Sequence, residues 1–158
     1  MKSLEEFKQM LLKEHESKFP DWPETPARYL GTWSDKKAGG LTKMILKYLR
    51  LKKHHAERVN TTGMPRKTKS GKMIWTFSGG MKGSADIHAI VQGRFVAIEI
   101  KVGRDVQSHE QILYEQEVQR SGGCYIIARD FETFVTWYKD FLCNTLCNED
   151  INIKQSSN

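Results

Sequence analysis

The chain has 158 residues, of which 39% are apolar and 28% charged, and its formal net charge is +6. This composition excludes a disordered chain and a collagen-like one, because it supplies enough apolar side chains for a buried core. No apolar run approaches the roughly 20 residues that a membrane-spanning helix requires. The N-terminal segment carries acids and no purely apolar stretch. We therefore expect a cytoplasmic globular domain with an appendage and no membrane partner.

The first 40 residues are expected to form a helix and a connector. Apolar residues at Leu4, Phe7 and Leu11 follow a helical period, which predicts a helix over residues 4–19. Three prolines between residues 20 and 26 end it, and the segment FPDWPETPARYLGTW is expected to pack against the main domain through its aromatic residues. Residues 34–40 are predicted to be a loop that ends at Gly39 and Gly40. This interpretation divides the chain into an appendage (1–34), a main domain (35–145) and a frayed tail (146–158).

The remaining elements alternate between helical and strand patterns. Helices are predicted over residues 41–53, 108–120 and 131–143, and strands over residues 56–60, 84–91, 94–102 and 124–129. The Gly-, Ser- and Lys-rich stretch between residues 61 and 83 is predicted to be a loop or a ragged hairpin, with Ile74, Trp75 and Phe77 inside it. This order of elements predicts an α/β fold in which a central mixed sheet carries helices on both faces.

The positive charge is concentrated in one stretch of the chain. Residues 43–82 contain eleven bases and one acid, Glu57, so this segment carries +10 while the remainder carries −4. A concentrated basic stretch is typical of proteins that bind a polyanion, most often nucleic acid. A solvated basic loop without a partner is the alternative.

The two strands around residue 92 place two carboxylates side by side. Gln92-Gly93 fits a two-residue hairpin turn, in which Val91 pairs with Arg94 and Asp86 therefore pairs with Glu99. Because side chains alternate between the faces of a strand, one face is entirely apolar. It carries Ala85, Ile87, Ala89, Val91, Val96, Ile98, Ile100 and Val102. The opposite face brings Asp86, His88, Glu99 and Lys101 together.

Two acids that face each other on neighbouring strands have Cβ atoms roughly 5 Å apart, so their negative charges repel each other. A nearby positive charge is needed to offset this repulsion. A divalent cation such as Mg²⁺ or Mn²⁺ supplies it, and such an ion also activates phosphodiesters toward water. Lys101 lies on the same face and is placed to orient the water or stabilise charge on the phosphate. The alternative is a solvated surface network of ion pairs. His88 is interpreted as a partly buried packing residue, and His54 and His55 as part of the basic surface.

The motifs GSADIHAIV, VAIEIK and QSHEQILYEQEVQRSGGCYIIAR resemble the PD-(D/E)xK nuclease superfamily, most closely its VRR-NUC branch. The resemblance extends over residues 41–138 and implies a restriction-endonuclease-like core. It implies that Asp86 and Glu99 hold the metal, that Lys101 acts at the scissile phosphate and that Gln111 supports the site. Gln111 equally fits a capping box with Ser108, and the two roles are expected to compete.

Further implications and one departure accompany the resemblance. The segment ERVNTTG resembles an R-x-N-x-G segment of the family, which implies nucleic-acid contacts by Arg58 and Asn60. Other candidate contacts are the bases Arg66, Lys67, Lys69, Lys72 and Lys82. Residues 39–53 lack the acid that family members often carry on the first core helix, so Asp35 or Glu57 is a candidate substitute.

Together, these residues predict a metal-dependent endonuclease that hydrolyses DNA. Analogy with the family implies branched, flapped or Holliday-junction-like substrates and a homodimer. The alternatives are a non-catalytic nucleic-acid-binding module on the same fold, a ribonuclease, and an anion-binding interaction protein.

Overall fold

The computed structural model describes residues 2–22, 31, 33–59, 64–76 and 81–155. Its centre is a mixed four-stranded sheet in the order β1-β4-β5-β6, formed by β1 (His55–Arg58), β4 (Ile87–Val91), β5 (Arg94–Ile100) and β6 (Cys124–Ala128). The first three strands are antiparallel, and β6 runs parallel to β5 after a crossover through α4 (His109–Arg120). A second, two-stranded sheet pairs β2 (Met64–Lys67) with β3 (Met73–Thr76).

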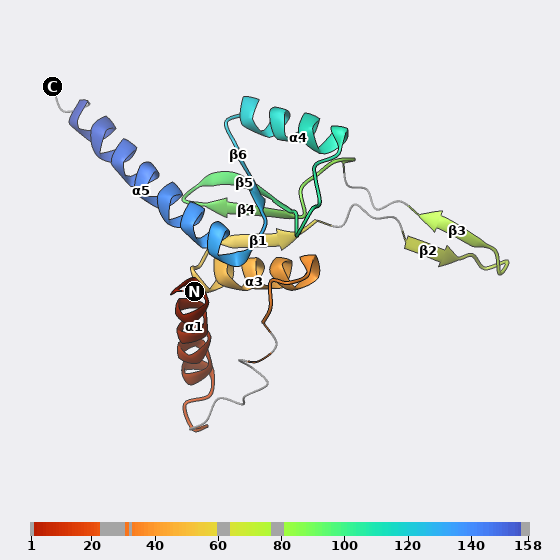
Figure 1. The fold of residues 1–158 in the computed structure, drawn as a ribbon, viewed down its shortest axis with the longest axis horizontal. Helices are drawn as coiled ribbons and strands as arrows, with labels where there is room; N and C mark the ends of the chain where they lie inside the picture. Colours follow the sequence, from red (N-terminus) through yellow and green to blue (C-terminus); the bar gives the residue numbers. More distant parts are fainter. Residues whose placement is uncertain (1, 23–30, 32, 60–63, 77–80, 156–158) are drawn as a thin grey trace.

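Helices cover both faces of the main sheet, as the sequence predicts (Figure 1). The helices α1 (Lys2–Lys18), α3 (Ala38–Leu51) and α5 (Phe131–Gln155) share one apolar core with the sheet. The opposite face carries α4 over a smaller cluster that contains Ala85, Ala97 and Val118. Among the described residues, no helix is long and apolar enough to span a membrane.

The β4–β5 hairpin has the predicted register. Val91 pairs with Arg94 and Ile87 with Ile98 across it. Both turn residues have positive φ, 49° at Gln92 and 72° at Gly93, which matches the right-handed twist of the flanking strands. Ala85 differs from its prediction: it lies in the cluster under α4 instead of the main core, because the ladder begins only at Ile87.

The N-terminal segment is part of the main core. Phe7 and Leu11 are fully buried, and the Phe7 ring lies 5.2 Å from that of Trp33 and 5.1 Å from that of Phe131. The helix α1 therefore packs on the sheet side that α3 and α5 cover.

Two helix boundaries differ from their predictions. The helix α3 begins at Ala38, so Gly39 and Gly40 lie in its first turn and do not end a loop. A Cβ at Gly40 would lie 2.0 Å from the Ser34 carbonyl oxygen, so the chain before the helix folds tightly against this turn. The helix α5 continues past residue 143 to Gln155, a stretch without glycine or proline to end it.

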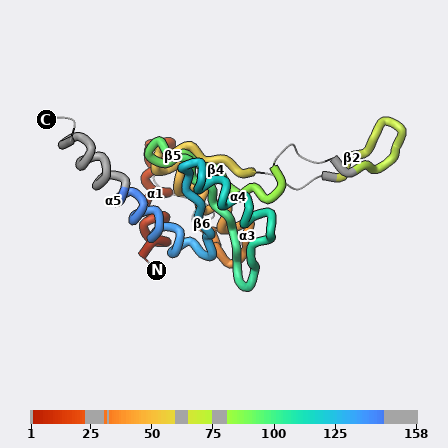
Figure 2. Tube along the Cα trace, turned by 90° about the horizontal axis from the view of Figure 1, so that it is seen from above, coloured from red at the N-terminus to blue at the C-terminus, as the bar shows by residue number. Residues whose placement is uncertain are grey.

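The β2–β3 hairpin stands apart from the rest of the molecule in two perpendicular views (Figures 1 and 2). Of the two predicted alternatives the segment forms a hairpin, and Ile74 and Trp75 lie on its strand β3. Ile74 is 40% exposed and Met73 is 59% exposed, while Phe77 lies outside the described residues.

Candidate active site

Asp86 lies immediately before β4, one step beyond the last pair of the β4–β5 ladder. Its backbone carbonyl accepts a hydrogen bond from Val59 N–H at 2.8 Å. Its side-chain Oδ2 accepts one from the backbone N–H of Ile100 at 2.9 Å. The carboxylate is therefore anchored at the sheet end where β1, β4 and β5 meet, opposite Glu99 in the continued register.

Glu99 is a buried carboxylate, with 2% of the residue exposed. Its Oε1 accepts a hydrogen bond from Gln111 Nε2 at 2.6 Å and lies 3.2 Å from Lys101 Nζ. Its Oε2 is buried without a hydrogen-bond partner among the described residues. Burial, together with the nearby charge of Asp86, raises the pKa of Glu99 to about 7, although Lys101 opposes the shift.

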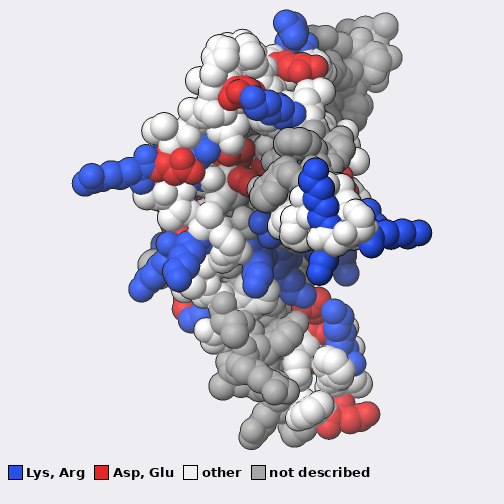
Figure 3. Space-filling model, turned by 90° about the vertical axis from the view of Figure 1, so that its right-hand side faces the viewer, with Lys and Arg blue, Asp and Glu red and all other residues white. Residues whose placement is uncertain are grey.

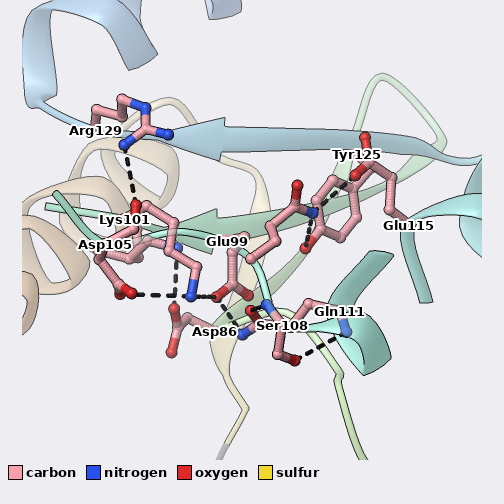
Figure 4. Close-up of polar contacts among 11 residues, drawn as sticks. Asp86, Glu99, Lys101, Asp105, Ser108, Gln111, Glu115, Tyr125 and Arg129 are labelled. Carbon is pink, nitrogen blue, oxygen red and sulfur yellow. Dashed lines mark hydrogen bonds and ion pairs between the residues drawn. The ribbon is translucent and has the colours of Figure 1, made fainter. Parts of the chain in front are cut away.

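Lys101 extends the cluster toward the loop that follows β5. Its backbone N–H donates to the carbonyl of Ala128 at 3.0 Å, and its Nζ lies 3.4 Å from Asp105 Oδ2 as well as near Glu99. Figure 4 shows the amine directed between the two carboxylates, with Asp86 beside them. Lys101 is only 6% exposed, so the expected alternative of a solvated surface network does not describe this cluster.

Gln111 performs both roles that the sequence suggested were in competition. Its Oε1 accepts from the backbone N–H of Ser108 at 2.9 Å, while Ser108 Oγ accepts from the Gln111 N–H at 3.3 Å, which completes the capping box. Its Nε2 is then free to donate to Glu99. The two ends of one amide thus tie the start of α4 to the buried carboxylate.

The segment before Asp86 fixes the position of α4. Gly83 has a φ of +83°, and a Cβ there would lie 2.4 Å from the Glu110 carbonyl oxygen. Lys82 Nζ lies 2.7 Å from Glu110 Oε1, and this hydrogen-bonded pairing lowers the pKa of the Glu110 carboxyl to about 2. Lys82, a predicted nucleic-acid contact, therefore already has an acidic partner.

The histidines have packing partners. His88 Nε2 lies 2.8 Å from the hydroxyl of Tyr114, on whose ring it stacks, and burial lowers the pKa of its imidazole. This environment agrees with the predicted packing role. His54 was predicted to belong to the basic surface, but its Nε2 lies 2.8 Å from the Tyr138 hydroxyl and it is half-buried.

Neither candidate for a third acid joins the cluster. Asp35 Oδ2 accepts from the backbone N–H of Phe131 at 3.1 Å, so it caps α5 instead. Glu57 pairs with His88 across β1 and β4 and is exposed. Within the described part of the chain, no group of three or more His, Cys, Asp or Glu side chains is placed to hold a metal ion.

The two carboxylates nevertheless have the chemistry that a divalent cation requires. Glu99 presents a buried oxygen without a partner among the described residues, and burial, with the nearby charge of Asp86, raises its pKa. Hard cations such as Mg²⁺ bind one or two carboxylates and keep water for their other positions. Asp86 and Glu99 fit such an ion, with Lys101 neutralising part of the charge.

Most of the predicted nucleic-acid contacts lie outside this cluster. Arg66, Lys67, Lys69 and Lys72 are exposed on the β2–β3 hairpin. Arg58 is exposed at the end of β1, where its pairing with Ile87 places it on the α3 side of the sheet. Asn60 lies outside the described residues. Figure 3 shows Lys and Arg side chains gathered on the hairpin side of the molecule.

A second polar group beside the site was missed by sequence reasoning. Gln107 Nε2 donates to Glu115 at 2.8 Å and lies 3.5 Å from the Tyr125 hydroxyl. Burial, with a contribution from Glu99, raises the pKa of Tyr125. The strand alternation of CYIIA could have indicated the position of Tyr125. This residue pairs with Ala97 of β5, so its side chain lies on the α4 side of the sheet. Asp105 had no such signal, because it lies in a loop.

Comparison with models of known protein families and with curated proteins found no match for this chain.

Proposed function

We propose that this protein is a metal-dependent endonuclease that hydrolyses phosphodiester bonds in DNA. The observation that carries the proposal is the environment of Glu99. It is a buried carboxylate with one oxygen unpartnered, Asp86 beside it and a buried lysine within 3.2 Å. Perturbed acids of this kind concentrate at functional sites, because burial and like charge are costly in a purely structural role.

Each residue of the site would have a separate role in hydrolysis. Asp86 and Glu99 would hold Mg²⁺ or Mn²⁺, which when bound polarises a phosphodiester and lowers the pKa of its water. Lys101 places a positive charge beside the phosphate, where negative charge develops during hydrolysis. Gln111 donates a 2.6 Å hydrogen bond to the Glu99 carboxylate and so would hold it in the orientation that a metal ion requires.

The mixed sheet and its flanking helices are compatible with a restriction-endonuclease-like core of the VRR-NUC type. In that fold, the Asp86, Glu99 and Lys101 positions correspond to the motif quoted above. The same resemblance supports a structure-selective activity on branched or flapped DNA, and a homodimer that cuts two strands. These two points rest on analogy of fold and motif.

One observation favours a second candidate, a non-catalytic nucleic-acid-binding module. Among the described residues, no third acid joins Asp86 and Glu99 in a group placed to hold a metal ion, and one oxygen of Asp86 is already bonded to the Ile100 N–H. In that case the basic residues would still bind nucleic acid, but no cation would be held and no bond would be cut.

Cleavage assays separate these functions. Branched, duplex and single-stranded DNA, and duplex RNA, are incubated with the protein at pH 8 with Mg²⁺, with Mn²⁺ or with EDTA. The proposal expects metal-dependent cleavage of DNA that Asp86→Asn abolishes. Metal-independent binding without any cleavage would instead establish the binding module, and cleavage confined to RNA would establish a ribonuclease.

A further inference from the structure

The β2–β3 hairpin, residues 64–76, forms a projecting arm with a closed tip. Thr68 N–H donates to the Lys72 carbonyl at 2.8 Å, and Gly71 N–H donates to the Thr68 carbonyl at 2.9 Å. The Thr68 hydroxyl also bonds both the carbonyl and the N–H of Lys72, at 3.0 and 3.1 Å. The tip is therefore pre-organised by its own hydrogen bonds, although the arm stands away from the sheet (Figures 1 and 2).

Positive charge is distributed over both faces and the tip of this arm. Arg66 and Lys67 are neighbours on β2, so their side chains point to opposite faces of the ribbon. Lys69 lies in the turn at the tip, and Lys72 follows it. All four are exposed, none has an ion pair with an acid among the described residues, and the sequence has no acid from residue 58 to residue 85.

The apolar residues of the arm give it a mixed surface. Arg66 pairs with Ile74 and Lys67 with Met73, so each face combines a base with an exposed apolar side chain. A solubilising loop has no need of exposed Met and Ile, whereas a surface that enters a groove uses apolar contacts with base edges and cations toward phosphates.

We propose that this arm inserts tip-first into the major groove of B-form duplex DNA, and so selects duplex DNA as the substrate. The inference rests on the proposed function and deepens it. The major groove is about 12 Å wide and admits a two-stranded β-ribbon, whereas the minor groove is about half as wide. A ribbon with a cation on each face places one positive charge toward each phosphate backbone, and the cationic tip adds further positive charge within the groove.

This geometry discriminates between nucleic acids by shape. The major groove of A-form duplex RNA is deep and too narrow for side chains to read, and a single strand has no groove. The arm therefore adds affinity for duplex DNA and much less for either RNA duplexes or single strands. Because its contacts are largely with phosphates, the preference depends little on base order.

The test compares two charge-matched variants of the full chain. The arm variant replaces Arg66, Lys67 and Lys69 by Ala. The control variant replaces Lys2, Lys13 and Arg120, which are exposed on α1 and at the far end of α4. Affinities for duplex DNA, duplex RNA and single-stranded DNA of equal length are measured in EDTA, so that binding is independent of cleavage, over a series of salt concentrations.

The proposal expects the arm variant to lose about tenfold or more in affinity for duplex DNA. In a plot of log affinity against log salt concentration, its slope should become shallower by up to about 2.7, or about 0.9 for each of the three lost phosphate contacts. Losses on duplex RNA and single strands stay below about threefold, as do all losses of the control. Methylation of guanine N7, in the major groove, interferes with binding of the wild type and no longer does so with the arm variant.

Three outcomes would overturn the inference. These are equal losses on all three nucleic acids, interference only from adenine N3 in the minor groove, and an unchanged salt slope. The last would place the DNA-binding surface elsewhere, with Lys43, Lys47 and Arg50 of α3 as the next candidates. Arm-dependent binding without metal-dependent cleavage would remove the nuclease proposal alone and leave the arm assignment standing.

Discussion

The two faces of the β4–β5 hairpin belong to the same strands yet have opposite chemistry. One face buries Ile87, Val91 and Ile98 completely in the core shared with α1, α3 and α5. The other carries the buried Glu99, which Gln111 of α4 contacts, and the buried Lys101 just after β5. The helix α4 has a single buried residue, Val118. The face that α1, α3 and α5 cover holds the main apolar core, whereas the face that α4 covers has only a small apolar cluster and holds buried charged groups beside it. The difference shows how a sheet that is stable on one side can hold a strained site on the other.

Substitutions at Glu99 and Ile98, which are adjacent on β5 but lie on opposite faces, test the difference between the two faces most directly. Glu99→Gln should reduce metal-dependent cleavage by about 10⁴-fold, the scale on which essential catalytic groups act. Its neighbour on the opposite face supplies the control, because Ile98→Ala should instead lower the free energy of unfolding by about 2–5 kcal/mol. Cleavage rates and urea unfolding curves of both variants test this. Near-wild-type cleavage by Glu99→Gln would refute the site assignment.

Lys101→Ala should lower turnover by about 10²–10³-fold, the usual effect of removing one group that stabilises developing charge. The carboxylates remain, so Mg²⁺ should still raise the melting temperature of this variant at pH 8. A change confined to DNA affinity, with turnover at saturation intact, would instead make Lys101 a phosphate anchor.

Gln111 links α4 to the polar face, and its two contacts are separable. Ser108→Ala removes the cap and should cost about 1 kcal/mol of stability. Gln111→Ala removes the cap and the hydrogen bond to Glu99, so it should also weaken metal affinity by about 10–100-fold. Mn²⁺ titrations of the two variants give the comparison. Equal metal affinities in both would mean that the Glu99 contact does not orient the carboxylate.

The raised pKa of Glu99 predicts a pH dependence that Glu99→Gln removes. Between pH 4.5 and about 7 the folded state retains a proton that the unfolded state has released, so folding stability falls as pH rises through this window. The loss should be about 3 kcal/mol in metal-free buffer, relative to the variant. Urea unfolding at pH 5, 6, 7 and 8 measures the difference. Parallel profiles for wild type and variant would show that Glu99 titrates normally.

Local sequence was sufficient to predict the hairpin and its register. Gln92-Gly93 accommodates two consecutive positive φ angles, and the strict alternation of apolar residues on either side leaves one register that buries them. The juxtaposition of Asp86 and Glu99 follows from this register alone. The helices also followed from apolar periodicity, although their ends did not, because Gly39 and Gly40 are read locally as breakers.

By contrast, only the tertiary structure determines the environment of the site residues and of Asp35. Glu99 contacts Gln111 of α4, Lys101 contacts Asp105 of the loop after β5, and the orphaned oxygen of Glu99 depends on where Gln111 points. Asp35 caps a helix that begins 96 residues later, a contact that no local pattern encodes. Periodicity determines which face a side chain occupies, because that depends on the chain's own geometry. Desolvation and the pKa shifts that it causes depend on what packs against that face, and therefore on contacts between segments far apart in the sequence.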